Sequence, residues 1–213
     1  MKKDKLILKD GTEFEGVSFG ANQSVSGEVV FATGMVGYPE ALTDPSFSGQ
    51  ILVLTYPLVG NYGCPNKKFW ESNRIQISGL IVSEYIDTPS HHQKEKTLAQ
   101  WLKDSGIPAL IIKDTRAITQ KLRDQGAMLG KIIVSGKNIK FEDPNKRNLV
   151  AEVSTKKVSF FGAGLKTVVL IDCGVKQNII RSLVARDLKV VVVPWNTNVT
   201  RLNFKFSAVV ISN

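Results

Sequence analysis

The sequence predicts a mixed α/β protein built in two parts. Three observations predict it: the first 60 residues hold apolar, β-branched runs separated by turns, residues 94–134 alternate helical and strand patterns, and residues 167–211 run strand, helix, strand. The last alternation is typical of a parallel sheet, because a helix returns the chain to start the next strand in the same direction. We expect a domain at 1–150, a linker at 151–165 and an α/β domain at 166–213.

The first part is expected to be rich in strands. Asp10-Gly11 is a hairpin turn signal between the first two of them. Residues 34–49 are broken by Gly and Pro, which predicts a loop with one helical turn. The expected strands share alternating or continuous apolar residues; they are 5–9, 13–19, 27–33, 51–56 and 75–86.

Two helices are expected in the middle of the chain, at 94–105 and 115–125. Each places its apolar residues on one face, and each precedes a glycine suited to end a helix, Gly106 and Gly126. An apolar strand is expected after each helix, at 107–112 and 129–134.

The last part is expected to form a βαβ unit. The expected strands are 167–172, 189–194 and 208–211, and the helix 175–186 lies between the first two. Crossover connections of this kind are right-handed and join parallel strands. Parallel sheets are normally covered on both faces, yet the strand at 208–211 has nothing to cover its outer edge. We therefore expect the chain to be a fragment of a longer protein, or a partner to complete the sheet.

The composition indicates a water-soluble globular protein. Hydrophobic residues make up 43% of the chain, and no run of about 18 apolar residues could span a membrane. The basic N-terminus leads into only three apolar residues, 6–8, which is too short for a secretory signal. We expect a cytoplasmic protein without a membrane partner.

The net charge of +9 suggests nucleic-acid binding, but its distribution argues against that function. Residues 151–213 hold 9 Lys and Arg against 3 Asp and Glu, and these basic residues are scattered without interleaved aromatics. We expect no nucleic-acid partner and explain the charge by a solvated basic surface or by acidic partner residues. A nucleic-acid-binding protein stays the alternative that charge alone suggests.

The cysteines and histidines do not predict a catalytic or metal site. Cys64 and Cys173 are far apart and lack partners at metal-ligand spacing, so we expect two free thiols and no metal. A nucleophilic Cys needs a base beside it. The only histidines, His91 and His92, fall in a polar stretch that predicts a solvated loop. We expect Cys173 to be a buried small side chain and Cys64 a loop residue.

Residues 34–49 are the best candidate for a ligand site on pattern alone. The stretch combines hydroxyls, carboxylates and glycines between two buried strands, which suits a small-ligand loop. The turn at 172–178 lacks the glycine and lysine pattern of a phosphate loop, so no nucleotide is expected there, although Lys176 could face a cleft. The polar members of the first stretch are Glu40, Thr43, Asp44, Ser46 and Ser48.

Eight stretches in this order resemble one family. They are LKDGTEFEG (8–16), GEVVF (27–31), MVGYPEALTDPSFSGQ (35–50), LTYP (54–57), GNYG (60–63), DTRAIT (114–119), LVAEVS (149–154) and DCGVKQNI (172–179). Together they span nearly the whole chain, and they resemble the small, glutamine-hydrolysing subunit of carbamoyl-phosphate synthase.

The resemblance implies a β/β/α N-terminal domain followed by the first strands and helix of a flavodoxin-like class I glutamine amidotransferase domain. Enzymes of this family hydrolyse glutamine with a Cys–His–Glu triad through a thioester. The ammonia passes to a large subunit, which uses ATP, Mg²⁺ and bicarbonate to make carbamoyl phosphate for arginine and pyrimidine biosynthesis. The implied partners are that large subunit, in a heterodimer, and L-glutamine. Nucleotide binding belongs to the large subunit, and no cofactor is expected in this one.

Four residues match functional positions of the family. Ser46 matches the serine that binds glutamine, and Gly34, Met35 and Lys176 match positions near the ammonia path and the domain interface. The Gly-Pro-Gly oxyanion loop is expected directly after Asn213, and the triad has no match in this chain. We therefore expect no catalytic residue in residues 1–213 and no glutaminase activity from them alone. The alternative is a non-catalytic docking module for the large subunit.

Overall fold

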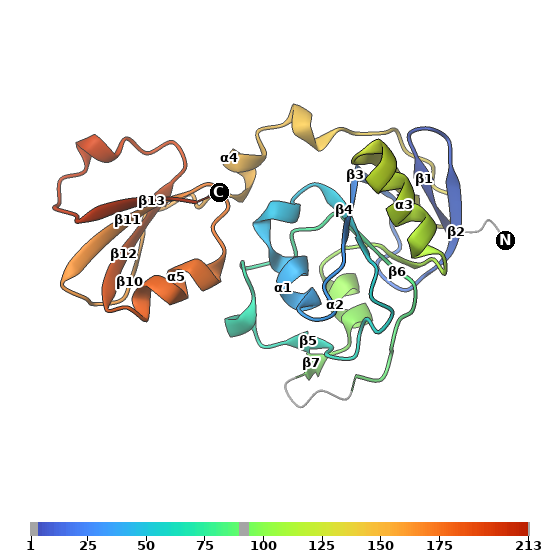
Figure 1. The fold of residues 1–213 in the computed structure, drawn as a ribbon, viewed down its shortest axis with the longest axis horizontal. Coiled ribbons are helices and arrows are strands. Elements are labelled where there is room, and N and C mark those ends of the chain that lie inside the picture. The colour runs from blue at the N-terminus through green and yellow to red at the C-terminus, as the bar shows by residue number, and fades with distance from the viewer. Residues whose placement is uncertain (1–3, 90–93, 213) are drawn as a thin grey trace. The chain divides into compact units, whose positions relative to one another are not determined.

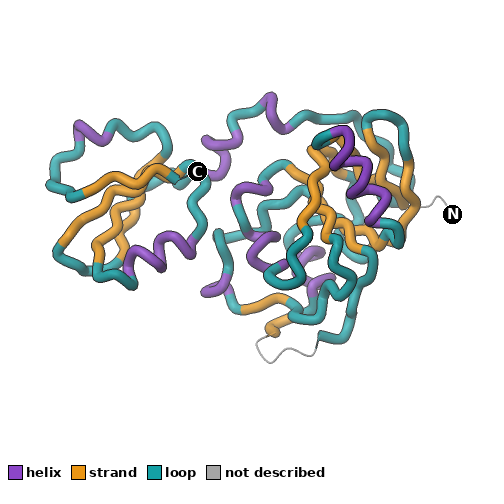
Figure 2. Tube along the Cα trace, in the orientation of Figure 1, coloured by secondary structure: helices purple, strands orange, loops and turns teal. Residues whose placement is uncertain are grey.

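The computed structural model describes residues 4–89 and 94–212, and it divides the chain into two compact units, 1–147 and 148–213. Figure 1 shows the elements of both units, and Figure 2 shows how helices, strands and loops alternate in each. The division falls at Arg147–Asn148, three residues before the expected domain boundary. No helix of the described residues is long and apolar enough to cross a membrane.

The first unit is a closed seven-stranded barrel in which β3, β4, β6 and β8 run parallel to their neighbours in that series and the remaining pairs are antiparallel. Closure leaves no unpaired strand edge. In barrel order the strands are β1 (Asp4–Leu8), β2 (Glu13–Ser18), β8 (Ala109–Ile111), β6 (Gly79–Val82), β4 (Gln50–Leu54), β3 (Val25–Ala32) and β9 (Met128–Ile133).

Short elements connect these strands. The helices are α1 (Tyr38–Thr43), α2 (Leu98–Asp104) and α3 (Thr115–Gln125), and the 3₁₀ turns are η1 (Pro45–Phe47), η2 (Lys67–Phe69) and η3 (Pro144–Lys146). A separate two-stranded ribbon consists of β5 (Cys64–Pro65) and β7 (Lys94–Lys96). The helix at 115–125 is confirmed with its predicted bounds, and Asp114 caps it by accepting the Ala117 N–H at 2.8 Å.

Three expectations for this unit were wrong in detail. The strand expected at 75–86 is confined to β6, because the Gln76 N–H binds the Leu42 carbonyl outside any sheet. The helix expected from residue 94 begins after Thr97, whose hydroxyl caps it by accepting the Gln100 N–H. Cys64 is a fully buried strand residue and not a loop residue.

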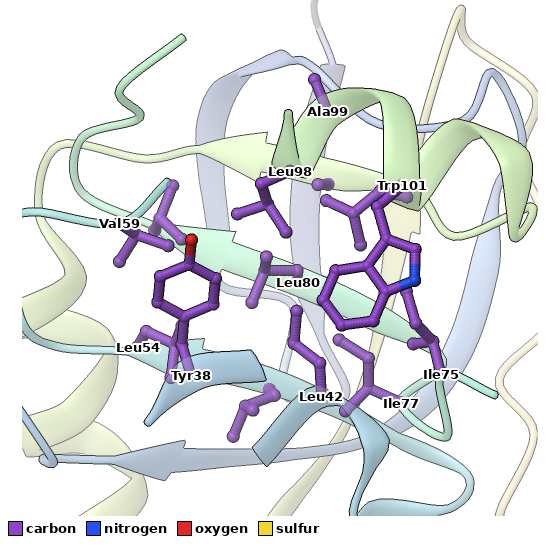
Figure 3. Packing of buried hydrophobic residues seen from close by; sticks show 14 of the residues in the cluster. Tyr38, Leu42, Leu54, Val59, Ile75, Ile77, Leu80, Leu98, Ala99 and Trp101 are labelled. Atoms are coloured by element: carbon purple, nitrogen blue, oxygen red, sulfur yellow. The ribbon is translucent and has the colours of Figure 1, made fainter. Parts of the chain in front are cut away.

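The barrel strands carry two apolar clusters on opposite faces. Successive residues of β4 point to different clusters, as the two-residue period of a strand requires: Ile51 and Val53 to one, Leu52 and Leu54 to the other. All seven strands contribute to the first cluster, which fills the barrel interior together with α3. Helices α1 and α2 cover the second, where Leu42, Leu80 and Trp101 pack together (Figure 3).

The second unit is a four-stranded sheet in the order β10-β12-β11-β13. The parallel pairing of β11, β12 and β13 was predicted and is confirmed. Antiparallel β10 was not predicted; it pairs with β12 inside the stretch expected to be a linker, where three residues give too short a pattern to recognise. The strands are β10 (Ser159–Phe161), β11 (Lys166–Asp172), β12 (Leu188–Pro194) and β13 (Ala208–Ile211), accompanied by α4 (Leu149–Val153), α5 (Gln177–Val184) and η4 (Val199–Arg201).

Both faces of this sheet are covered, but by different kinds of structure. Helix α5 packs Ile180 against Leu170, Val190 and Val192 on one face. On the other face, the irregular segment between β12 and β13 contributes Phe204 and other partly buried apolar residues. Each unit therefore has its own apolar core.

Candidate functional site

Ser46 lies in the 3₁₀ turn η1, directly after helix α1. The residue is exposed, and its backbone N–H donates to Asp44 Oδ1 at 2.9 Å. Pro45 lies between them and is buried, and proline fixes its own φ angle. Gly49 lies between this turn and β4; its φ of +80° suits glycine, and a Cβ atom there would lie 2.6 Å from Pro144 Cβ. An exposed hydroxyl is thus held on a tightly constrained backbone.

Helix α1 is anchored at its start as well. Gly37, with φ +83°, is the N-cap, and Pro39 occupies the first turn, where proline is well tolerated. The Tyr38 hydroxyl donates to the Gly63 carbonyl at 3.0 Å, and its ring stacks on Tyr62 with centroids 5.5 Å apart. Burial raises the pKa of Tyr38 well above its ordinary value, so the hydroxyl stays protonated and remains a donor.

Gly34 and Met35 lie in the exposed loop between β3 and α1. Both line a small, mainly apolar pocket of about 80 Å³, together with residues of β4, of α1 and of the segment after β4. Met35 is 68% exposed and Val36 is 71% exposed. Exposed apolar side chains beside a pocket are typical of a surface that contacts another molecule or another part of a protein.

Lys176 belongs to the second unit, where it is the exposed N-cap residue of α5. The turn before it is built on Asp172, which is 6% exposed. Asp172 Oδ1 accepts the N–H groups of Gly174 at 2.9 Å and Val175 at 2.8 Å. Its Oδ2 accepts the Thr155 N–H at 2.7 Å, which ties the residues after α4 to this turn. The backbone that carries Lys176 is therefore held in place by these three hydrogen bonds to Asp172.

The structure separates the residues that the sequence singled out. Gly34 and Met35 share a pocket, whereas Ser46 follows the opposite end of α1, which at six residues is about 9 Å long. Thr43 and Asp44, counted among the polar ligand-binding candidates, are 0% and 5% exposed and turn inward. Their role is to hold the loop in place.

The two thiols differ in accessibility. Cys64 is fully buried, and burial raises the pKa of its thiol to about 12, so it is not a nucleophile near neutral pH. Cys173, expected to be buried, is only partly so, because it lies in the turn that follows β11. His91 and His92 lie outside the described residues. Within 4–89 and 94–212, no group of three or more His, Cys, Asp and Glu side chains could hold a metal ion.

An open polar trough of about 610 Å³ was not predicted from the sequence. Most of its lining residues precede or begin β3, β4, β6 and β8, and the others follow β9, so it lies at the end of the barrel where these parallel strands start. The side-chain carbonyl oxygen of Gln76, one of them, is buried and has no hydrogen-bond partner among the described residues. No sequence signal reveals such a site, because its residues come from separate segments that only the barrel brings together.

Two family models match the chain in succession. The model of the carbamoyl-phosphate synthase small chain, CPSase domain, matches residues 6–132, which include Ser46 and the barrel strands β2 to β8. The model of the class-I glutamine amidotransferase matches residues 169–213, which include Lys176. The first match alone covers more than half of the chain.

Curated relatives match across both units. The chain is 47% identical over 213 residues to carbamoyl-phosphate synthase (ammonia), mitochondrial, of Mus musculus, covering 95% of this chain and 14% of that protein. It is 49% identical over 210 residues to the protein of the same name from Aquarana catesbeiana, covering 93% of this chain and 14% of that protein. It is 44% identical over 225 residues to the carbamoyl phosphate synthase arginine-specific small chain of Saccharomyces cerevisiae, covering 99% of this chain and 55% of that protein.

The chain thus spans about half of the yeast small chain and a much smaller share of the vertebrate proteins. The matched order of the two models agrees with the order of the two compact units, barrel first and parallel sheet second. This chain belongs to the carbamoyl-phosphate synthase small-chain family.

Proposed function

We propose that this chain is the N-terminal part of the glutamine-hydrolysing component of a carbamoyl-phosphate synthase. In this proposal the Ser46 hydroxyl contacts bound L-glutamine, and the ammonia released from glutamine passes to a large synthetase subunit that holds ATP and Mg²⁺. The observation that carries it is the exposed serine on a rigid turn, inside the segment that matches the small-chain model. A fixed hydroxyl can orient a substrate without losing its own conformational entropy on binding.

The proposal assigns the exposed loop of the first unit and Lys176 of the second to the ammonia path and the domain interface. The exposure of Met35 and Val36 beside an apolar pocket supports the first assignment. The parallel order β12-β11-β13, with the first strand of the three in the centre, supports a flavodoxin-like arrangement for the second unit. Two unpaired thiols support a reducing, cytoplasmic compartment.

We further propose that residues 1–213 alone do not hydrolyse glutamine. The buried Cys64 has a raised pKa, and Cys173 lies in a turn whose neighbouring carboxyl, Asp172, is occupied with backbone amides. The buried Cys64 thiol does not provide the activated thiolate that thioester formation requires, and Asp172 is not available as a base beside Cys173.

The test is an assay of the complete coding frame that contains this chain, co-purified with the large subunit. Carbamoyl phosphate formation is measured with glutamine or with ammonium as nitrogen donor. We expect glutamine to support synthesis, and Ser46→Ala to raise the KM for glutamine about tenfold, the equivalent of losing one good hydrogen bond. Ammonium-dependent synthesis should stay unchanged. A KM for glutamine that Ser46→Ala leaves unaltered would contradict the proposed role of Ser46.

A second candidate function is favoured by the names of the vertebrate relatives, which specify ammonia. In this alternative the chain is a non-catalytic docking module of an enzyme that takes free ammonia, serving arginine or pyrimidine synthesis through the large subunit. The same assay separates the two candidates: ammonium would support synthesis and glutamine would not.

A further inference from the structure

Residues 71–76, some thirty positions further along the chain, form hydrogen bonds that cap the C-terminal end of helix α1. The last carbonyl groups of a helix have no partner within the helix. Here the Leu42 carbonyl accepts the Gln76 N–H at 2.8 Å, and the Thr43 carbonyl accepts the Ser72 hydroxyl at 2.6 Å. The Gln76 side-chain amide in turn donates to Ser72 Oγ at 2.9 Å. Residues 71–76 therefore cap α1 from outside.

The side chain of Thr43, the last residue of α1, also takes part in these capping hydrogen bonds. Its fully buried hydroxyl lies 3.0 Å from the Pro39 carbonyl, to which it donates, and it accepts the Glu71 N–H at 2.9 Å. Beneath it, Leu42 is fully buried in the cluster that contains Leu80 and Trp101 (Figure 3). The end of α1 is fixed by four hydrogen bonds and by the core below it.

Asp44 connects the fixed end of α1 to Ser46. Its carboxyl is buried, so it has little access to a bound molecule, and Oδ1 accepts the Ser46 N–H at 2.9 Å. This bond forms an Asx turn, in which the side chain of one residue sets the backbone direction two residues later. With Pro45 buried between them, the direction of the Ser46 side chain depends on Asp44.

We propose that Asp44 is a positioning residue for glutamine binding, acting through the backbone of Ser46. The inference rests on the proposed function of Ser46. Asp44 itself does not touch glutamine; it holds the serine hydroxyl in the direction that the substrate requires. Loss of its carboxyl oxygen weakens glutamine binding without changing the chemistry that follows.

The chain offers a matched control for this proposal. Asp143-Pro144-Asn145 repeats the Asp-Pro-x turn of residues 44–46: Asp143 Oδ1 accepts the Asn145 N–H at 3.0 Å, and Pro144 is buried in η3. The Asp143 carboxyl belongs to a different turn, and the neighbouring Pro144 approaches the loop of Ser46, at Gly49. Removing its carboxyl abolishes the same kind of bond at another position on the same unit.

The experiment uses the complete enzyme with its large subunit and compares Asp44→Ala, Asp44→Asn and Asp143→Ala. We expect Asp44→Ala to raise the KM for glutamine about three- to tenfold, since one hydrogen bond is worth about 0.5–1.5 kcal/mol. The kcat with glutamine and the ammonium-dependent rate should stay within about twofold of wild type, a change of under about 0.5 kcal/mol. Asp44→Asn keeps the acceptor oxygen and should restore the wild-type KM, and Asp143→Ala should leave it unchanged.

Three outcomes would overturn the inference: an unchanged KM in Asp44→Ala while Ser46→Ala raises it, an equal rise in Asp143→Ala, or a parallel loss of glutamine- and ammonium-dependent rates. If Ser46→Ala also leaves the KM unchanged, the proposed function of Ser46 fails first. If Asp44→Ala does not fold, Asp44→Ser retains a shorter acceptor and should raise the KM by a smaller factor. A raised KM in Asp44→Ser beside a wild-type KM in Asp44→Asn, with a normal melting temperature in both variants, would support the positioning role. A raised KM in Asp44→Asn would oppose it.

Discussion

The two units of the chain differ in whether their sheets have edge strands that pair on one side only. Every strand of the barrel pairs on both sides, and strand β4 is buried over its last four residues. In the open sheet, β10 and β13 each pair on one side only among the described residues, and Ile211 of β13 is 71% exposed. The barrel is a self-contained frame, whereas the sheet has two open edges.

This difference decides what each unit can support. The barrel carries the turn of Ser46 on a helix that is capped from outside and packed on a fully buried cluster. The sheet instead depends on single polar groups for order at its carboxyl ends, above all on Asp172. We therefore expect the barrel to be the more stable unit and the sheet to respond more strongly to loss of one side chain.

The largest effect is expected from a leucine in the barrel. Leu80 of β6 and Leu170 of β11 are both fully buried, so Leu80→Ala and Leu170→Ala remove the same atoms from the two units. Each should lower the free energy of unfolding of its own unit by about 2–5 kcal/mol. Leu80→Ala belongs at the upper end, because closure of the barrel limits how far β6 can shift toward α1 and α2 to fill the cavity on the face that these helices cover.

Tryptophan fluorescence during urea unfolding separates the units. Trp70 and Trp101 lie in the barrel with ring centroids 4.8 Å apart, and Trp195 lies in the second unit. The measurement is repeated in a Trp195→Phe background, which reports on the barrel alone. If Leu170→Ala shifts the barrel transition as much as Leu80→Ala does, the two units unfold as one and the comparison fails.

A somewhat smaller effect is expected from Asp172→Ala in the sheet. Three backbone N–H groups lose their acceptor, at about 1 kcal/mol or more each, so the second unit should lose about 3 kcal/mol of stability. Asp172→Asn keeps one oxygen for Gly174 and Val175 and turns an amide donor toward Thr155, so it should lose less. The Trp195 transition in urea is the measurement, and equal losses in both variants would argue against this division of roles.

Most helices and strands could be predicted from local sequence patterns, but the closure of the barrel could not. The helix at 115–125 and the parallel pairing of the last three strands follow from periodicity within short windows. The barrel closes through the pairing of β1 with β9, strands at opposite ends of the unit, and no local signal specifies such a partner. Strand β10 escaped prediction for the opposite reason, since three residues hold too little pattern.

The sequence singled out Ser46 as a candidate site residue, but it did not reveal how the residues around Ser46 are arranged. Ser46 was found because its surrounding motif resembles a family, and the structure places it on an exposed turn. The burial of Thr43 and Asp44 was missed. The partners of Thr43 are Glu71 and Ser72, polar residues almost thirty positions away with an ordinary loop pattern. Burial of a polar side chain is decided by such distant partners, which sequence spacing does not reveal.

The labelling rates of the two cysteines also compare the two units, because each unit contains one cysteine. Cys64 is fully buried with its pKa raised to about 12, so at pH 8 it is a protonated thiol without access to reagent. Cys173 is partly exposed. We expect N-ethylmaleimide to label Cys173 first and Cys64 only when the barrel opens, as measured by mass spectrometry of quenched samples. Leu80→Ala should accelerate labelling of Cys64 alone; fast labelling of Cys64 in the wild-type chain would contradict the burial.

The smallest effect is expected from a partly exposed ion pair of the barrel. Lys121 of α3 lies 2.6 Å from Asp10 Oδ2, and this hydrogen bond, with the Thr12 N–H, lowers the pKa of Asp10 to about 2. A lowered folded-state pKa contributes stability that is present above the ordinary value of 3.8 and is lost as the pH falls through about 2. Exposed pairs contribute little in water, so Lys121→Met should barely change unfolding at pH 7.

The same variant should nevertheless move the titration of Asp10 clearly. Without Lys121 the pKa of Asp10 rises toward its ordinary value, though not fully, since the Thr12 N–H still donates to it. The carboxyl carbon resonance of Asp10 in an NMR titration measures this shift, and Lys5→Met, which removes the neighbouring pair with Glu13, is the matched control. A large loss of barrel stability at pH 7 in Lys121→Met would show that surface charge, and not closure and packing, distinguishes the barrel from the open sheet.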